Sequence, residues 1–184
     1  ASATIDEVTG SLALTTLDTA TGTLTFKDVD LTDGHSITVT NAAASADDLT
    51  AVTVTVGSID VVAHFIQSDA TGVLPTGDAL AAVQAAAANA TFTVTEDSDS
   101  TGTGTGALTW NFEAADGNFD FLAAGEKLTL TYSVKADDGT ANDTQDVTIT
   151  IVGSNDAPII SVETGDHASA TIDEVTGSLA LTTL

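Results

Sequence analysis

The side chains in this sequence that are best suited to chemistry are carboxylates gathered at predicted turns. Asp28, Asp30 and Asp33 follow directly after a predicted strand. Alternate side chains of an extended chain point the same way, so the carboxylates of Asp28 and Asp30 can face one ion. Calcium takes about 6–8 oxygen ligands, and carboxylates supply them. The spacing therefore predicts a calcium site, and a solvated acidic turn is the alternative.

A second group of oxygen-bearing side chains lies in a predicted turn between two strands. It contains Asp137 and Asp138, with Asn142 and Asp143 a few residues further on. Gly139 permits the positive φ that a tight turn needs. Such a turn accounts for the glycine and one aspartate, but not for four acidic or amide side chains within seven residues. A calcium site and a plain turn both remain open here.

The segment from Asp116 to Asp120, with Asn118 between them, has the spacing at which an EF-hand loop begins. It lacks the glycine at loop position six and the glutamate at position twelve. An EF-hand is therefore rejected, and a looser oxygen site remains open.

Signatures of catalysis are missing from the sequence. His35, His64 and His167 lack the spacing of a zinc protease, and there is no cysteine. No nucleophile-elbow, Walker or Rossmann pattern occurs. Trp110, the only tryptophan, lies in an alternating apolar pattern and is expected in the core rather than as a sugar-stacking platform. We therefore expect no enzyme activity.

The composition excludes several classes of partner. Three lysines, no arginine and 27 acidic residues give a net charge of −24. Nucleic acids and anionic membranes both need clustered positive charge, so neither is expected to bind. No apolar run approaches the roughly 20 residues of a membrane span, so we expect no direct membrane insertion. Hydrophobic residues make up 42 % of the chain, which is too many for an acidic disordered segment.

Alternation of apolar and polar residues predicts many short strands separated by acidic or glycine-rich turns. The strands are expected around residues 23–27, 37–39, 52–54, 92–94, 108–112, 128–134 and 147–151. This pattern predicts an all-β, antiparallel sandwich. One alanine-rich segment, about 77–89, predicts a short inserted helix, whose start Thr76 or Asp78 can cap.

The chain repeats itself. Residues 168–184 are identical to residues 1–17, which gives a period of 167 residues. This period has the size of a domain, so we expect one repeat unit over 1–157 and the start of the next copy over 158–184. A unit used many times suits a spacer, and a recombination duplicate is the alternative. Without an initiator methionine or signal peptide, we expect a fragment of a longer protein or a processed form.

Three segments resemble the VCBS repeat of large bacterial surface and RTX-type adhesins. They are GTLTFKDVDLTD at 22–33, FDFLAAGEKLTLTYSVKADDGT at 119–140 and DVTITIVGSNDAPII at 146–160. The resemblance implies an immunoglobulin-like or cadherin-like sandwich that is secreted to the bacterial cell surface, strung in tandem and folded with calcium. Residues 41–90 show no such resemblance.

The resemblance also implies ligands near the domain ends. Asn155 and Asp156 resemble the cadherin linker, in which calcium draws on two neighbouring domains; a simple Asn-Asp turn is the alternative. Glu7 stands where that family places a glutamate at the end of the first strand. Asp120 and Glu126 stand near its acidic motif, and Asp28 with Asp30 resembles its acidic pair.

The expected function is that of a calcium-binding structural extender in a secreted, cell-surface adhesin. Ca²⁺ would neutralise clustered carboxylates and stiffen the linkers, and the partners would be neighbouring repeats of a monomeric unit. The alternative is a glycan- or protein-binding adhesin module on the same sandwich, which the unmatched stretch 41–90 suggests. Self-association between like modules is a third class.

Overall fold

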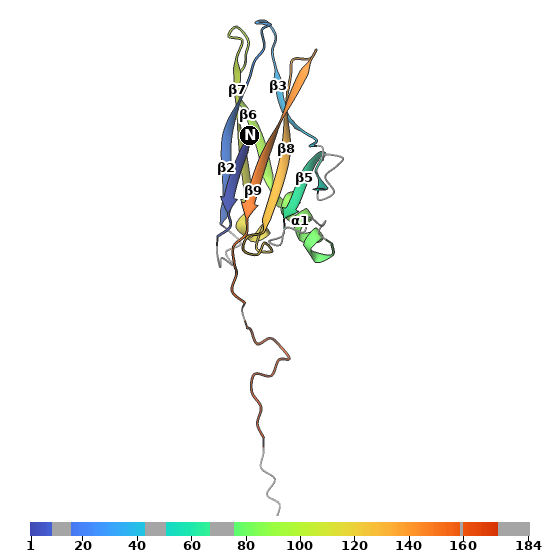
Figure 1. The fold of residues 1–184 in the computed structure, drawn as a ribbon, viewed down its shortest axis with the longest axis vertical. Coiled ribbons are helices and arrows are strands. Elements are labelled where there is room, and N and C mark those ends of the chain that lie inside the picture. Colours follow the sequence, from blue (N-terminus) through green and yellow to red (C-terminus); the bar gives the residue numbers. More distant parts are fainter. Residues whose placement is uncertain (9–15, 43–50, 67–75, 159, 173–184) are drawn as a thin grey trace, which may run out of the picture.

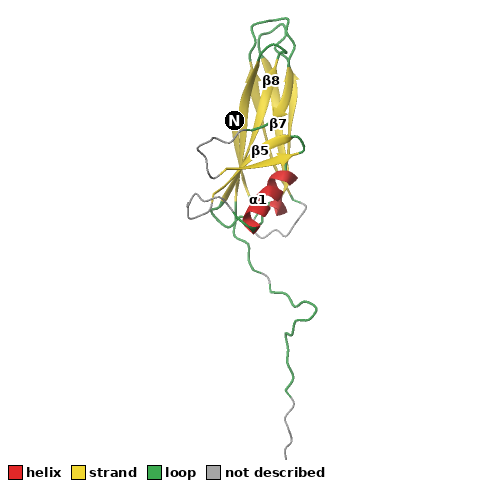
Figure 2. Cartoon of the chain, turned by 90° about the vertical axis from the view of Figure 1, so that its right-hand side faces the viewer, coloured by secondary structure: helices red, strands yellow, loops and turns green. Residues whose placement is uncertain are grey.

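Two β-sheets pack face to face in an elongated sandwich, and the residues after Val152 leave it at one end (Figure 1, Figure 2). This computed structural model describes residues 1–8, 16–42, 51–66, 76–158 and 160–172, and only the backbone of Phe65 and Ile66. The predicted all-β sandwich with one short helix is confirmed. Parts of the unmatched stretch, 43–50 and 67–75, lie outside the described residues, as do residues 159 and 173–184 of the partial second copy.

The larger sheet has the order β1-β9-β8-β5-β4, and β3 pairs with the upper half of β8. Its strands are β1 (Ser2–Asp6), β3 (Ser36–Thr40), β4 (Ala51–Val56), β5 (Ile59–Ile66), β8 (Lys127–Asp137) and β9 (Asn142–Val152). All of these pairs are antiparallel except β1 with β9, which is parallel. The expectation of a purely antiparallel sandwich is therefore wrong at this one edge.

The smaller sheet has the order β2-β7-β6 and is antiparallel. Its strands are β2 (Leu17–Phe26), β6 (Thr91–Ser98) and β7 (Gly106–Ala115). The helix α1 (Asp78–Asn89) precedes β6, as predicted, and the short helix η1 (Asp116–Asn118) follows β7. Gly77 occupies the N-cap of α1 without a side-chain cap hydrogen bond, so neither predicted capping residue acts as one. With 12 residues in α1 and three in η1, no described helix could span a bilayer.

The core lies between the sheets, where alternate residues of the long strands point inward. Leu128, Leu130, Ile149 and Ile151 are fully buried, and α1 adds Val83, Ala86 and Ala87 to the same cluster. Trp110 is only 2 % exposed, which confirms that it is a core residue.

The strand β5 was not among the predicted strands, because Ile59–Ile66 is a nearly continuous apolar run without alternation. Val61 and Ala63 join the core, and Val62 between them is only 2 % exposed. Since both faces of the strand are covered, nothing selected polar residues for an outer face.

The two ends of the sandwich carry different loops. The upper end in Figure 1 carries the loops 27–35 and 99–105 and the turn between β8 and β9. The lower end carries η1, the loop 119–126 and the point where the chain leaves after β9. The predicted ligand residues are divided between these ends.

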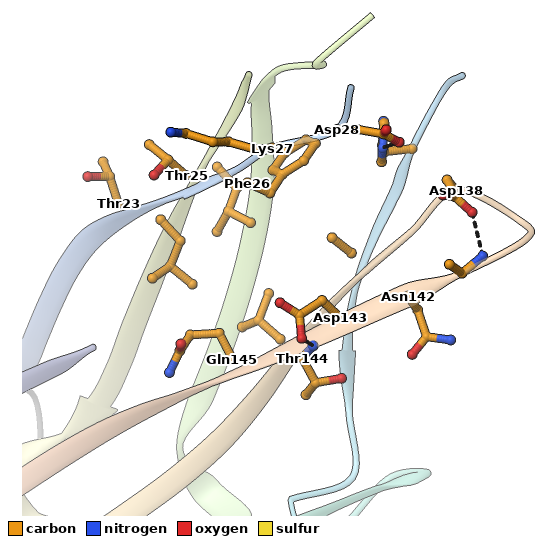
Figure 3. Close-up of a pocket in the computed structure, with 16 residues that line it drawn as sticks. Thr23, Thr25, Phe26, Lys27, Asp28, Asp138, Asn142, Asp143, Thr144 and Gln145 are labelled. Carbon is orange, nitrogen blue, oxygen red and sulfur yellow. Dashed lines mark hydrogen bonds and ion pairs between the residues drawn. The ribbon is translucent and has the colours of Figure 1, made fainter. Parts of the chain in front are cut away.

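An open groove of about 850 Å³ lies between the two sheets in the upper half (Figure 3). One wall is the edge strand β2 with its continuation, residues 23–28, and the other is 141–145, the β8–β9 turn and the start of β9. Apolar side chains line its interior: Leu24, Phe26, Leu108, Val134 and Ala136.

Candidate metal centres

Five acidic side chains from separate segments act on one another electrostatically at the lower end, and we call them the lower carboxylate cluster: Glu7, Asp18, Asp116, Asp120 and Asp156. Glu7 follows β1, Asp18 is in β2, Asp116 begins η1, and the other two lie in the loops after η1 and after β9. The negative charges of Asp116, Asp120 and Asp156 raise the pKa of Glu7. The charge of Asp116 also raises the pKa of Asp18 and of Asp120. The cluster is therefore one electrostatic unit.

Three members of this cluster are buried with an unsatisfied oxygen. The exposed fractions are 5 % for Glu7, 6 % for Asp18 and none for Asp116. Glu7 Oε2 accepts a hydrogen bond from the Ser154 backbone at 2.8 Å, and Asp116 Oδ1 accepts one from Val8 at 3.1 Å. The second oxygen of each, and Asp18 Oδ2, have no hydrogen-bond partner in the described part of the chain. Such oxygens are costly to bury unless a proton or a cation satisfies them.

The backbone explains how these side chains come together. The amide of Glu7 donates to Val152 O at 3.0 Å, which extends the β1–β9 pairing by one residue. The amide of Asp116 donates to Thr16 O at 2.9 Å, which ties η1 to the start of β2. Asp18 stands at an inward position of β2, opposite Ala114 of β7. Four segments thus converge on one point.

The chain leaves the sandwich through a tight contact. The amide of Gly153 donates to Glu126 O at 2.9 Å. A Cβ at Gly153 would lie 2.5 Å from Leu122 O and 2.6 Å from Ala123 O. The closeness requires glycine here and fixes the path of the residues that follow, including Asp156.

Burial is the main reason why protons bind tightly in the lower cluster. It raises the pKa of Glu7 to about 7, an effect that the Ser154 hydrogen bond opposes and the charges of Asp156, Asp120 and Asp116 reinforce. Burial and then Asp116 raise the pKa of Asp18 to about 6, and burial with the charges of Asp116 and Asp156 raises that of Asp120. A bound divalent cation would reverse these shifts, because it favours the ionised carboxylates.

Of the predicted ligands, Glu7, Asp120 and Asp156 belong to this cluster through their electrostatic effects on one another. Among the described residues, the three acidic side chains whose ligand oxygens all lie within 4.8 Å of one another are those of Asp28, Asp33 and Asp138 at the other end of the sandwich. Glu126 accepts a hydrogen bond from the Ala123 backbone at 2.9 Å and closes its own turn. Asn155 is exposed and donates to the carbonyl of Asp156 at 3.2 Å. These described contacts of Glu126 and Asn155 are local.

Asp18 and Asp116 were not among the predicted ligands. Asp18 could have been found, because it takes an inward position in a strand whose later inward residues include Ala20, Leu24 and Phe26. Asp116 was noted only for its spacing to Asp120, and its complete burial depends on contacts from distant segments.

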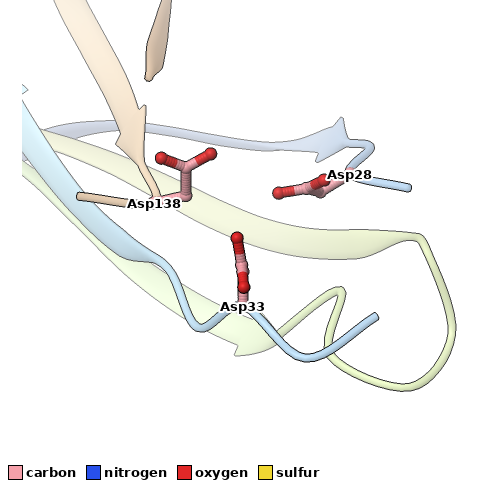
Figure 4. A group of neighbouring side chains, drawn as sticks. All are labelled: Asp28, Asp33 and Asp138. Carbon is pink, nitrogen blue, oxygen red and sulfur yellow. The ribbon is translucent and has the colours of Figure 1, made fainter. Parts of the chain in front are cut away.

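At the upper end, Asp28, Asp33 and Asp138 form a second group, the upper aspartate cluster (Figure 4). One carboxylate oxygen of each lies within 4.8 Å of the others, and all three side chains are half-buried. The first two come from the loop between β2 and β3, and Asp138 comes from the turn after β8. The structure therefore joins the two acidic turns that the sequence treats separately.

A histidine that carries positive charge when protonated lies beside the upper cluster. His35 Nδ1 is 2.7 Å from Asp99 Oδ1, and its Nε2 is 3.0 Å from Asp28 Oδ2. The Asp99 hydrogen bond, opposed by burial and helped by Asp28, raises the pKa of His35, and this pairing lowers the pKa of Asp99 to about 2. When protonated, His35 would compete with a metal ion for Asp28. His35 and Asp99 are 64 residues apart, so their pairing was not foreseen.

The two remaining predicted ligands of the upper end are used locally. Asp30 is exposed, and its amide donates to Asp28 Oδ1 at 2.8 Å. Asp137 Oδ2 accepts from Lys135 Nζ at 2.8 Å, and this bond, followed by one from Gly139, lowers the pKa of Asp137. Asp138 Oδ1 caps the turn by accepting from two backbone amides. Within the described contacts, only Asp138 of the Asp137–Asp138 pair belongs to the cluster.

Comparisons with known proteins add little to this geometry. No family model matches the chain, and no curated protein matches it. Among solved structures, the CooA pilin subunit from enterotoxigenic Escherichia coli is similar, at 14 % identity over 85 % of this chain and 90 % of that chain. The TM-score of 0.32 is too low to carry an argument about fold or function.

Proposed function

We propose that this chain is a calcium-stabilised spacer unit of a secreted, tandemly repeated bacterial surface adhesin of the VCBS type. The observation that carries the proposal is the set of unsatisfied carboxylate oxygens of Glu7, Asp18 and Asp116, buried where the chain leaves for its next copy. The 17-residue identity of the second copy and the net charge of −24 support it.

The donor set of the lower cluster suits calcium. It offers carboxylate oxygens without sulfur or imidazole, and such oxygens are preferred by hard cations. The donors come from separate elements and loops, Asp18 from β2, Asp116 from η1 and the others from loops, and calcium tolerates such a varied ligand geometry better than magnesium, whose octahedral geometry is strict. A calcium ion there would bind β1, β2, η1 and the residues after β9 to one another. It would thereby hold the direction in which the chain leaves.

Calcium also provides a switch between compartments. Extracellular modules bind it with dissociation constants of roughly 0.1–1 mM, far above cytosolic levels. During export the buried carboxylates of the lower cluster would still repel one another. Outside the cell, bound calcium would neutralise this repulsion. Secretion thus becomes part of the folding mechanism.

Thermal unfolding of the metal-stripped chain with and without 10 mM calcium tests this proposal. With dissociation constants of roughly 0.1–1 mM, calcium should stabilise the folded state by about 1.4–2.7 kcal/mol. The variant Glu7→Gln keeps an acceptor for Ser154 but loses the charge. It should melt higher than the parent without calcium and gain less from calcium.

A matched control is Asp78→Asn, which removes an exposed carboxylate at the start of α1. It should retain the full calcium response. Equal melting temperatures of the parent chain with and without calcium would sink the proposal. An unchanged calcium response in Glu7→Gln would show that calcium does not bind at the lower cluster.

The second candidate is a glycan- or protein-binding module, and the groove of about 850 Å³ favours it, because this is the size of small-molecule sites. A glycan array probed with the single unit tests this function. Binding that Phe26→Ala abolishes, with the fold intact by circular dichroism, would favour it over the spacer.

A further inference from the structure

The parallel strand β1 covers only the lower half of β9. Its register runs from Ser2 opposite Thr148 to Asp6 opposite Val152. The amino group of Ala1 donates to Asp146 O at 3.0 Å, which marks the upper limit of this contact. Above it, β9 from Asn142 to Gln145 pairs only with β8 within the described chain.

The open groove lies in line with β1, directly above Ala1. It is bounded by the uncovered part of β9 and by β2, the edge strand of the other sheet. Both edges carry backbone groups that a further strand can pair with. Leu108 and Val134, each 3 % exposed, lie at its base beside the half-buried Leu24 and Phe26. The groove therefore has the shape and polarity for one more extended segment.

The second copy shows which segment stands in that place. Residue 168 is the counterpart of Ala1, so residues 160–167 directly precede the second β1. Ile160 is 97 % exposed and Val162 is 63 % exposed. Ile172 is 92 % exposed, whereas its counterpart Ile5 packs against the core. These apolar side chains lie in irregular backbone after β9, without a described sheet beside them.

A turn in this segment adjusts its length to the groove. If the segment continued the β1 register without a break, Val162 would lie opposite the next unit's counterpart of Ala141. That position is at the upper mouth of the groove. The amide of Asp166 donates to Glu163 O at 3.0 Å, and the amide of Glu163 donates to Asp166 Oδ2 at 2.9 Å. Such a turn shortens the path, so in a following unit it would bring Val162 and Ile160 down to the level of the apolar lining.

We propose that residues 160–167 occupy the groove of the unit that begins at Ala168, as the first part of its first strand. The folding unit is then offset from the 167-residue period and begins near Pro158. The link between units shrinks to about 153–157, because everything after it is held in the next sandwich. The inference depends on the tandem order of the copies and not on calcium.

The test is to place a copy of residues 160–167, ISVETGDH, directly before Ala1 of the full chain. The extended chain should melt higher by roughly 5 °C or more, because two apolar side chains become buried. Hydrogen exchange should slow at the amides of Asn142–Gln145 or of Thr23 and Thr25. The matched control carries the same extension with its Ile and Val changed to serine, as in Ile160→Ser and Val162→Ser, and should show neither effect.

Equal melting and exchange for the extended chain and its serine control would overturn the inference. So would a glycan that protects the groove amides equally well with and without the extension, because the groove would then be a ligand site. All measurements are made with and without calcium. A calcium response without an effect of the extension would leave the proposed function standing, and the reverse outcome would leave this inference standing.

Discussion

At the scale of single residues, the lower cluster predicts an unusual pH dependence. Glu7 has a pKa of about 7 in the folded chain and 4.5 in the unfolded chain, and Asp18 has about 6 and 3.8. Between these values the folded state holds protons that the unfolded state has lost. The contribution of Glu7 and Asp18 to the stability of the metal-free chain is therefore greatest below this window and falls as the pH rises to about 7.

The size of this loss follows from the shift. For Glu7 alone, the free energy of unfolding should fall by at most about 3 kcal/mol as the pH rises to about 7. His35 acts in the same direction, since its raised pKa gives stability that is lost as the pH rises through its folded pKa. Urea unfolding of the metal-stripped chain from pH 5 to pH 8 measures the sum. In the variant Glu7→Gln, the free energy of unfolding should lose the pH dependence that comes from Glu7 and keep the pH dependence that comes from His35.

Calcium should change this pH profile. The ion holds the carboxylates ionised, so its affinity should fall as the pH drops below about 7. At 10 mM calcium, the decline in stability toward pH 7 should become smaller or reverse. A metal-free chain whose stability does not fall over this range would contradict the proton binding inferred for Glu7 and Asp18.

At the scale of elements, a close contact joins β2 to β7. Gly22 stands opposite Trp110, and a Cβ there would lie 2.5 Å from the indole ring. Because Trp110 is almost fully buried, Gly22→Ala must displace it and should cost about 1–3 kcal/mol in urea unfolding.

The control for this substitution is Gly34→Ala. A Cβ at Gly34 would meet only Asp99, at an ordinary 3.7 Å. It should change stability by no more than a few tenths of a kcal/mol. Trp110 is the only tryptophan, so its fluorescence should change in Gly22→Ala alone. Equal stability of the two variants would mean that the sheets adapt to a methyl group at this crossing.

The sequence predicts elements better than it predicts their meeting points. The strands β8 and β9 could be found because their inward residues alternate with threonines, and α1 because alanine dominates it. The strand β5 was missed because burial on both faces removes alternation. The parallel pairing of β1 leaves no local mark, since it depends on where β9 lies.

The same reasoning applies to the candidate site. Acidic turns could be recognised one at a time, as at Asp28 and Asp138. Their partners could not, because the contacts of His35 with Asp99 and of Glu7 with Ser154 join segments 64 and 147 residues apart. Burial of Asp116 arises only when four segments close around it. Composition thus predicts carboxylate clusters in general terms, and topology decides which carboxylates lie near one another.

At the scale of the whole molecule, the two acidic clusters lie at opposite ends of an elongated body in a chain with a net charge of −24. The upper cluster has a histidine that can carry a compensating charge. The lower cluster has buried carboxylates without a described cation partner. Calcium should therefore act mainly at the lower end, beside the exit toward the next unit, and affect the angle between units more than their interiors.

A chain of two complete 167-residue units tests this view by small-angle X-ray scattering. In 10 mM calcium the two sandwiches should take one extended arrangement, because the lower cluster holds the exit and residues 160–167 lie in the second sandwich. Removal of calcium should broaden the distance distribution without shortening the individual units. The double variant Ile160→Ser and Val162→Ser should broaden the distance distribution even in calcium. It removes the apolar side chains that would hold the upper half of the second unit's first strand in the groove. A distribution that is unchanged by both treatments would mean that neither feature controls the junction.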